Sequence, residues 1–362
     1  MRLRNLQALR GIACLLVVFA HLSFFERRQE AQPPFFAPLD YIGFGAVDLL
    51  FVLSGFVITW SNANALGRPR RFAGYLGRRL WRVFPVYWAC WLAALPLAHR
   101  ADRAAYLLTH RAIWPMWSDL ALVPTFRTNL AMPQAWTMLY EVSFYIVFAG
   151  FVVLPRRAFV PCLIVWSAIS VGGLVFPAVA MHCTIDYGYV AAWVWRPSFL
   201  KIVLGCFVAL AVRRGWTGGG RTALVAGLAG LAAAAVVAYR VPGAWGRFEP
   251  FMLPAALLIY AAVAVERTRG WVLPRWLWLV GDASFPIYLI HLAVFEFGDR
   301  HFGGTGPTVL GHLTWLALMT GAALAAGFAL HAAIERPVLD LARPRKRSPG
   351  PPVEVPALRR AA

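Results

Sequence analysis

Long apolar segments recur along almost the whole chain, and they limit most strongly what this sequence can fold into. A helix needs about 20 such residues to cross a bilayer, and within a bilayer the backbone must satisfy its own hydrogen bonds. We therefore expect an all-α, polytopic integral membrane protein with about ten transmembrane helices around a central cavity. The ten segments lie at about 8–25, 43–61, 83–98, 135–154, 158–179, 189–211, 222–239, 251–266, 276–297 and 308–331.

The composition agrees with a membrane protein and excludes other classes. Hydrophobic residues make up 60% of the 362 residues, charged residues 14%, and the mean hydropathy is +0.61. A soluble domain carries about a quarter charged residues and has too small an interior to hide so much apolar surface. The net charge of +19 is spread between apolar segments, so no nucleic-acid partner is expected. The five cysteines lack CxxC spacing and predict neither a metal site nor a disulfide framework.

The basic residues predict the orientation of the chain. With a cytoplasmic N-terminus, most Arg and Lys fall in segments on the inside, including six Arg between residues 68 and 82, as the positive-inside rule requires. An even number of spans then places both termini in the cytoplasm. We expect one membrane domain over 1–337 and a basic, Pro-rich cytoplasmic tail over 338–362. The tail should attract anionic lipids, by about 1 kcal/mol per basic residue.

Four ionisable side chains are predicted at membrane depth, where a charge costs about 2.5 kcal/mol or more and indicates function. They are His21, Asp48, Glu141 and His291. Counting the helical rise from the predicted ends of the spans puts all four in the outer half of the bilayer, which suggests a shared cavity. Structural interpretations stay open: a hydrogen-bonded histidine for His21, a carboxylate at a helix N-terminus for Asp48, and an interfacial side chain for Glu141.

Arginines form a second group of candidate residues. Arg10 lies eleven residues before His21, so both project from one helix face with a rise of about 16 Å between them. Arg79 and Arg82 are three residues apart and also share a face. Guanidinium pairs suit phosphate oxygens, although the positive-inside rule alone also explains arginines at this position.

These two groups suggest a reaction. The arginines face the cytoplasm, the source of phosphorylated ligands, and a histidine oriented by a carboxylate is suited to act as general base for a hydroxyl. A cytoplasmic phosphate carrier with a long arm that meets an outward hydroxyl describes acyl transfer from coenzyme A. The alternatives are a transporter or flippase for a lipid-linked glycan, with charges along its path, and a non-catalytic scaffold.

Motifs over most of the chain resemble the membrane acyltransferase 3 family of bacterial O-acyltransferases. Between Leu6 and Pro337 they are LQALRG with its later histidine, GAVDLLFVLSGF, RRLWRVFP, AWTMLYEVSFY, GDASFPIYLIH and IERP. Each motif is weak alone, but six in this order are specific. Departures such as Leu50 and Phe285, where the family has Phe and Tyr, affect packing only. The chain is expected to lack the extracytoplasmic hydrolase-like domain of some members.

The resemblance implies a reaction and a location. An acyl group, most often acetyl from acetyl-CoA, would pass from the cytoplasmic side to a hydroxyl of an extracytoplasmic or membrane-linked glycan, without a metal. The location implied is the bacterial inner membrane.

The resemblance also implies roles for single residues. His21 would be the base or would relay the acyl group, and Asp48 and Glu141 would orient it or the acceptor. The residues that match the acyl-CoA-binding positions of the family are Arg10, Arg79, Arg82, Ser284, Tyr288 and His291.

Overall fold

The structure is a computed structural model, and it describes residues 3–28, 39–97, 113–123, 132–175, 196–241, 249–302 and 309–341. All regular secondary structure in these ranges is helical, as predicted. The helices are α1 (Arg4–Arg28), α2 (Leu39–Asn62), α3 (Phe72–Leu97), α5 (Ile113–Leu120), α6 (Trp136–Val153), α7 (Phe159–Val175), α10 (Pro197–Arg213), α11 (Gly220–Arg240), α13 (Met252–Arg269), α14 (Arg275–Asp282), α15 (Ser284–Phe302), α16 (Val309–Leu330) and α17 (Arg336–Leu341).

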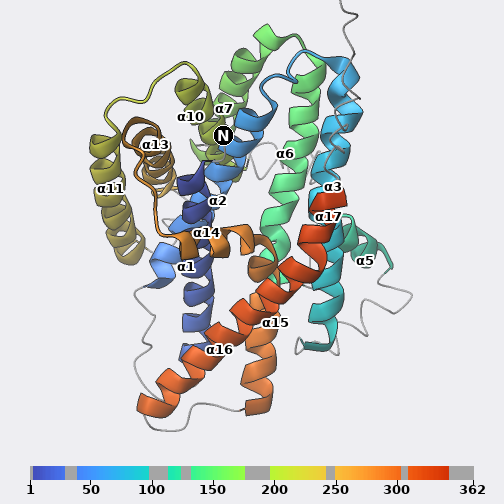
Figure 1. The fold of residues 1–362 in the computed structure, drawn as a ribbon, viewed down its shortest axis with the longest axis vertical. Coiled ribbons are helices and arrows are strands. Elements are labelled where there is room, and N and C mark those ends of the chain that lie inside the picture. The colour runs from blue at the N-terminus through green and yellow to red at the C-terminus, as the bar shows by residue number, and fades with distance from the viewer. Residues whose placement is uncertain are drawn as a thin grey trace, which may run out of the picture.

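Helix α1 is the element around which the others are arranged. It packs against α2, α13, α14, α15 and α16. In Figure 1, α11 and α13 lie on one side of α1 and α2, and α3 and α6 lie on the other. Helices α2 and α15, which carry Asp48 and His291, therefore pack directly on α1, whereas α3 and α6 pack against each other. Of the predicted tail, only the residues up to 341 fall within the described part.

The prediction of about ten spans is not confirmed. Among the described residues, six segments are long and apolar enough to cross a membrane, and α14 with α15 makes a seventh if this bent pair is one span. The six segments are Arg4–Glu26, Asp40–Asn62, Pro133–Val153, Arg156–Val175, Gly220–Arg240 and Val309–Leu341. The chain is thus a multi-pass membrane protein.

The three predicted spans without a counterpart coincide with helices α3, α10 and α13. Helix α3 carries Arg78, Arg79 and Arg82 in its first half, α10 has 17 described residues, and α13 ends with Glu266, Arg267 and Arg269 in its last four residues. Part of the predicted span 189–211 lies outside the described residues. Hydropathy alone identified these helices but did not separate them from complete spans.

A sharp break separates α14 from α15, whose axes are bent by 71°. Helix α14 is amphipathic: Leu277 and Val280 are buried, whereas Trp276 and Leu279 are exposed, as expected for a helix at a membrane interface. It lies against α1 so closely that a Cβ on Gly281 would overlap the carbonyl oxygen of Gln7. This contact fixes the start of α15 next to α1.

The N-terminus of α1 is held by a carboxylate from another helix. Glu266 of α13 accepts hydrogen bonds from the backbone N–H of Arg4 (2.9 Å) and of Asn5 (2.8 Å). The first N–H groups of a helix lack partners within the helix, and a negative charge is favourable there. The side chain of Asn5 also donates to the carbonyl oxygens of Ala262 and Trp271, so α1 and α13 are joined at this end.

Helices α2 and α10 are in backbone contact at two glycines. A Cβ on Gly205 would overlap the carbonyl oxygen of Val52, and a Cβ on Gly55 would overlap that of Ile202. Small residues at such positions allow membrane helices to approach closely. The contact places the LSGF segment of α2, which contains Ser54, against a rigid neighbour.

Substituting Gly205 with leucine is expected to prevent α10 from packing on α2, because overpacking of this kind costs about 1–3 kcal/mol even where side chains can adjust, and here the obstacle is backbone. The variant should lose its monodisperse peak in detergent size-exclusion chromatography. Gly321→Leu is the matched control, since Gly321 lies mid-helix with no atom within 4 Å of its Cβ position. A normal elution profile for Gly205→Leu would contradict the close contact.

Candidate functional site

A cavity lies among α1, α2, α3, α6 and the start of α15, with about 840 Å³ of empty space including its opening. It brings together residues that are far apart in the sequence. Six of the residues predicted for the site line it: Arg10, Arg79, Arg82, Glu141, Ser284 and Tyr288. Apolar side chains such as Phe51 and Leu53 cover much of the rest. Its lining therefore combines a charged part with an apolar part.

A second, more polar hollow adjoins the cavity, and we call it the vestibule. It has about 2160 Å³ of empty space including its opening, and it shares Arg10, Arg82 and Val57 with the cavity. The first turns of α1, helix α14, the π-helical turn His331–Glu335 and α17 line it. The vestibule and the cavity therefore border on the same two arginines.

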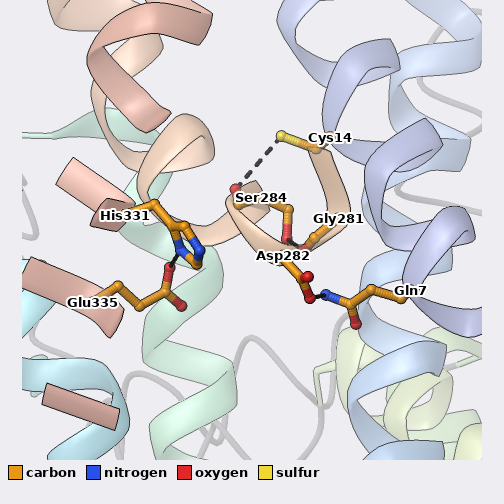
Figure 2. A network of polar contacts seen from close by, with 7 residues as sticks. All are labelled: Gln7, Cys14, Gly281, Asp282, Ser284, His331 and Glu335. Atoms are coloured by element: carbon orange, nitrogen blue, oxygen red, sulfur yellow. Dashed lines mark hydrogen bonds and ion pairs between the residues drawn. The ribbon is translucent and has the colours of Figure 1, made fainter. Parts of the chain in front are cut away.

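Two hydrogen-bonded pairs border the vestibule on opposite sides, as Figure 2 shows. On one side His331 Nδ1 lies 2.6 Å from Glu335 Oε2. On the other side Gln7 Nε2 donates to Asp282 Oδ1 at 2.8 Å and so ties α1 to the end of α14. These contacts hold in place the elements through which a ligand would enter.

The carboxylate of Glu141 is connected to the arginines of the cavity by a chain of contacts. Ser54 Oγ donates to Glu141 Oε1 at 2.9 Å, and the hydroxyl of Tyr145 donates to the same oxygen. The guanidinium of Arg79 lies over the Tyr145 ring, 5.7 Å from its centroid, and donates to Ser61 Oγ at 2.8 Å. Glu141 is therefore linked to Arg79 through Tyr145.

Hydrogen bonds fix α15 to its neighbours beside the cavity. The Tyr288 hydroxyl donates to the carbonyl oxygen of Gln134 and accepts from Thr137 Oγ1, both at 3.0 Å. Ser284 Oγ donates to the carbonyl oxygen of Gly281 at 2.8 Å, across the break between α14 and α15 (Figure 2). Cys14, one turn after Arg10, donates its thiol to the Ser284 carbonyl oxygen at 3.5 Å.

His21 and His291 contact each other about two turns beyond Cys14 on α1 and Ser284 on α15. His291 Nε2 lies 3.2 Å from His21 Nδ1, and the two ring centroids are 5.0 Å apart. His21 is half-buried and His291 fully buried. Neither is among the residues that line the cavity. The family resemblance placed His291 in the acyl-CoA-binding set, but its ring contacts His21 instead.

Asp48 occupies a different environment from the other predicted residues. Its carboxylate is 2.6 Å from Lys201 Nζ of α10, and both side chains are completely buried. Lys201 also lies 2.7 Å from Glu249. The expectation that equal depth brings His21, Asp48, Glu141 and His291 into one cavity is therefore not met: of the four, only Glu141 lines the cavity, the two histidines contact each other, and Asp48 is paired with Lys201. Depth fixes a position along the membrane normal, whereas the helix face decides which neighbour a side chain meets.

Three residues in these contacts were not predicted: Ser54 and Tyr145 at the cavity, and Lys201 beside Asp48. Tyr145 follows Glu141 by four residues, a spacing that places both on one helix face, so this signal was present in the sequence. Lys201 was the one lysine within an apolar segment. For Ser54 the signal in the sequence was limited to its place in the LSGF motif. Among the described residues, no group of three or more His, Cys, Asp or Glu is placed to bind a metal ion.

Comparisons with known proteins show which family the chain is similar to. A family model described as an acyltransferase domain matches residues 3–332. Acyltransferase MdmB of Streptomyces mycarofaciens is 30% identical over 99% of this chain and 98% of its own length. Exopolysaccharide production protein ExoZ of Rhizobium meliloti (strain 1021) is 28% identical over 85% of this chain and 93% of its own length. No solved structure matches the chain.

Lys201→Met is expected to destabilise the protein by about 3–5 kcal/mol, because it leaves the buried carboxylate of Asp48 without its cation. The double variant Asp48→Asn/Lys201→Met should recover part of this loss. Thermal unfolding in detergent measures both effects. If Asp48→Asn abolished activity while Lys201→Met left both stability and activity unchanged, the structural role of this pair would be contradicted.

Proposed function

The chain belongs to the membrane acyltransferase 3 family, and on this basis we propose that it moves an acyl group, usually acetyl, from cytoplasmic acyl-CoA to a hydroxyl of an extracytoplasmic or membrane-linked glycan. The observation that carries the proposal is that Arg10 and Arg82 line both the vestibule and the cavity. Family membership favours an acyltransferase over the glycan transporter that intramembrane charges alone also suggest. A relative named as an exopolysaccharide production protein supports a glycan acceptor.

The donor end of the site suits coenzyme A by charge and by shape. Arg10, Arg79 and Arg82 present guanidiniums at the mouth of the cavity, and guanidiniums bind phosphate oxygens in a bidentate manner. The diphosphate of acyl-CoA would lie there, with the adenosine part in the vestibule and the long, mostly uncharged arm in the cavity. With both termini in the cytoplasm of a bacterial inner-membrane protein, the vestibule faces the cytoplasmic pool of acyl-CoA.

Glu141 has a different role in this proposal from the one that the resemblance implies. Its carboxylate is held by Ser54 and by Tyr145, whose ring lies under the Arg79 guanidinium. We assign Glu141 to positioning Arg79 and to balancing the positive charge of the arginine group. A carboxylate at this place also keeps the cavity mouth from holding the product coenzyme A too tightly.

His21 is the proposed base. Its imidazole would take the proton of the acceptor hydroxyl while that oxygen attacks the thioester carbonyl carbon. The C–S bond then breaks, and the thiolate of coenzyme A takes the proton from the imidazolium. An acyl-imidazole formed on His21 and then attacked by the acceptor gives the same products. In either route the acyl group must pass from the cavity, which Tyr288 and Thr137 line, to His21, which does not line it.

Arg79→Ala and Arg82→Ala are each expected to weaken saturable binding of labelled acetyl-CoA to the purified protein about 10- to 100-fold. Charge-assisted hydrogen bonds contribute about 1.5–3 kcal/mol, which corresponds to this range. The matched control is Arg269→Ala, which removes an exposed arginine of α13 that lines neither hollow. Unaltered binding in both cavity variants would refute the donor site.

His21→Ala is expected to abolish acyl transfer but to leave acetyl-CoA binding within a few-fold of the original protein, because His21 does not line the cavity. The readout is mass spectrometry of surface glycans from cells that lack the gene and carry either version. Loss of an acyl group on deletion, restored by the original protein alone, supports the function. Near-normal transfer by the variant would show that His21 is not the base.

A further inference from the structure

We infer that His291 is a positioning residue that sets the tautomer and orientation of His21, so that the base presents an unprotonated Nε2 to the acceptor. This inference rests on the proposed function, in which His21 is the base. It is carried by three contacts: His291 Nδ1 to the Tyr288 carbonyl oxygen at 2.7 Å, His291 Nε2 to His21 Nδ1 at 3.2 Å, and His21 Nδ1 to the Val17 carbonyl oxygen at 2.9 Å.

The two carbonyl groups decide where the protons lie. A carbonyl oxygen can only accept a hydrogen bond, so Nδ1 of His291 carries a proton for Tyr288, and Nδ1 of His21 carries one for Val17. In the neutral rings both Nε2 atoms are then unprotonated. The Nε2 of His291 accepts a share of the His21 Nδ1 proton. The Nε2 of His21 keeps its lone pair and is the basic atom.

The same contacts support His21 after it has taken a proton. The new proton binds at Nε2, and the Nδ1–H of the imidazolium then points to two acceptors, the Val17 oxygen and His291 Nε2. Hydrogen bonds from a charged donor are about twice as strong as neutral ones. His291 stays neutral in this step, because a second proton between the facing nitrogens would set two N–H groups against each other.

A neutral partner is well suited to this depth in a membrane. In soluble hydrolases a buried carboxylate holds the catalytic histidine in the correct tautomer, but an isolated carboxylate inside a bilayer is costly whenever the histidine is neutral. His291 is fully buried, with the Phe295 ring 5.7 Å and the Tyr288 ring 5.9 Å from its own ring centroid. An imidazole satisfies the geometry there without adding a charge.

Two amide substitutions at position 291 distinguish a role in positioning His21 from a role in core packing alone. The side-chain amide of glutamine reaches about as far as Nε2, and that of asparagine about as far as Nδ1. His291→Gln can therefore still accept a hydrogen bond from His21 Nδ1, whereas His291→Asn keeps only the contact with the Tyr288 carbonyl. A merely structural histidine gives no reason for the two variants to differ in catalysis, since each buries one amide.

The experiment measures steady-state transfer from labelled acetyl-CoA by membranes that contain the acceptor, with His21→Ala in parallel. We expect kcat to fall about 10- to 100-fold in His291→Asn and to stay within about threefold of normal in His291→Gln. KM for acetyl-CoA should be unchanged in both, because His291 does not line the cavity. Equal kcat values in the two folded variants, whether normal or lost, would overturn the inference.

A measurement on the unaltered protein covers the case in which the variants do not fold. Solid-state NMR of protein labelled with ¹⁵N in histidine, with the His21 signals assigned by comparison with His21→Ala, reports which ring nitrogen is protonated. We expect neutral His21 with the proton on Nδ1; a proton on Nε2 would overturn the inference. If His21→Ala kept full activity, the proposed base would be wrong, whereas an inactive His21→Ala with a fully active His291→Asn would refute only the role of His291.

Discussion

The cost of an unpartnered charge within a membrane governs the placement of ionisable groups in this structure. Buried ions are tolerated only with a partner or with access to water. Asp48 has Lys201, and Glu26 at the far end of α1 has His312, at 2.8 Å. Glu141 is held by hydroxyl donors, and Arg10 lines both the vestibule and the cavity. At the site, neutral donors hold the carboxylate, and the two hollows leave room for a charged ligand.

Helix α1 gives the site its order along the membrane normal. Arg10 lines the vestibule and the cavity. Cys14 contacts the first residue of α15, and His21 lies outside the cavity lining, where its ring contacts His291. Contacts with the backbone of α1 hold its neighbours in place. Gly281 packs against the backbone of Gln7, and Glu266 accepts hydrogen bonds from the first N–H groups of the helix. The relative positions of donor site and base therefore depend mainly on one helix.

Most residues of the candidate site could be predicted from the sequence. The predictions that failed concern which helices are neighbours. Charges within apolar segments identified Arg10, Arg79, Arg82 and Glu141, and all four line the cavity. Counting residues along a span predicts depth, but it gives no information on which helices are neighbours. Pairing was therefore missed: Asp48 was expected near His21 and is bound to Lys201. Hydropathy likewise located the helices, and six or seven of the predicted spans are confirmed among the described residues.

The single continuous helix that carries both Arg10 and His21 has a consequence for how such a chain can vary. Substitutions between the two positions change packing and leave their spacing intact. One inserted or deleted residue, however, would turn everything beyond it by about 100° and shift it by about 1.5 Å, which would swing the imidazole off its partner. This stretch of the protein can therefore tolerate changes of residue type far more readily than changes of length.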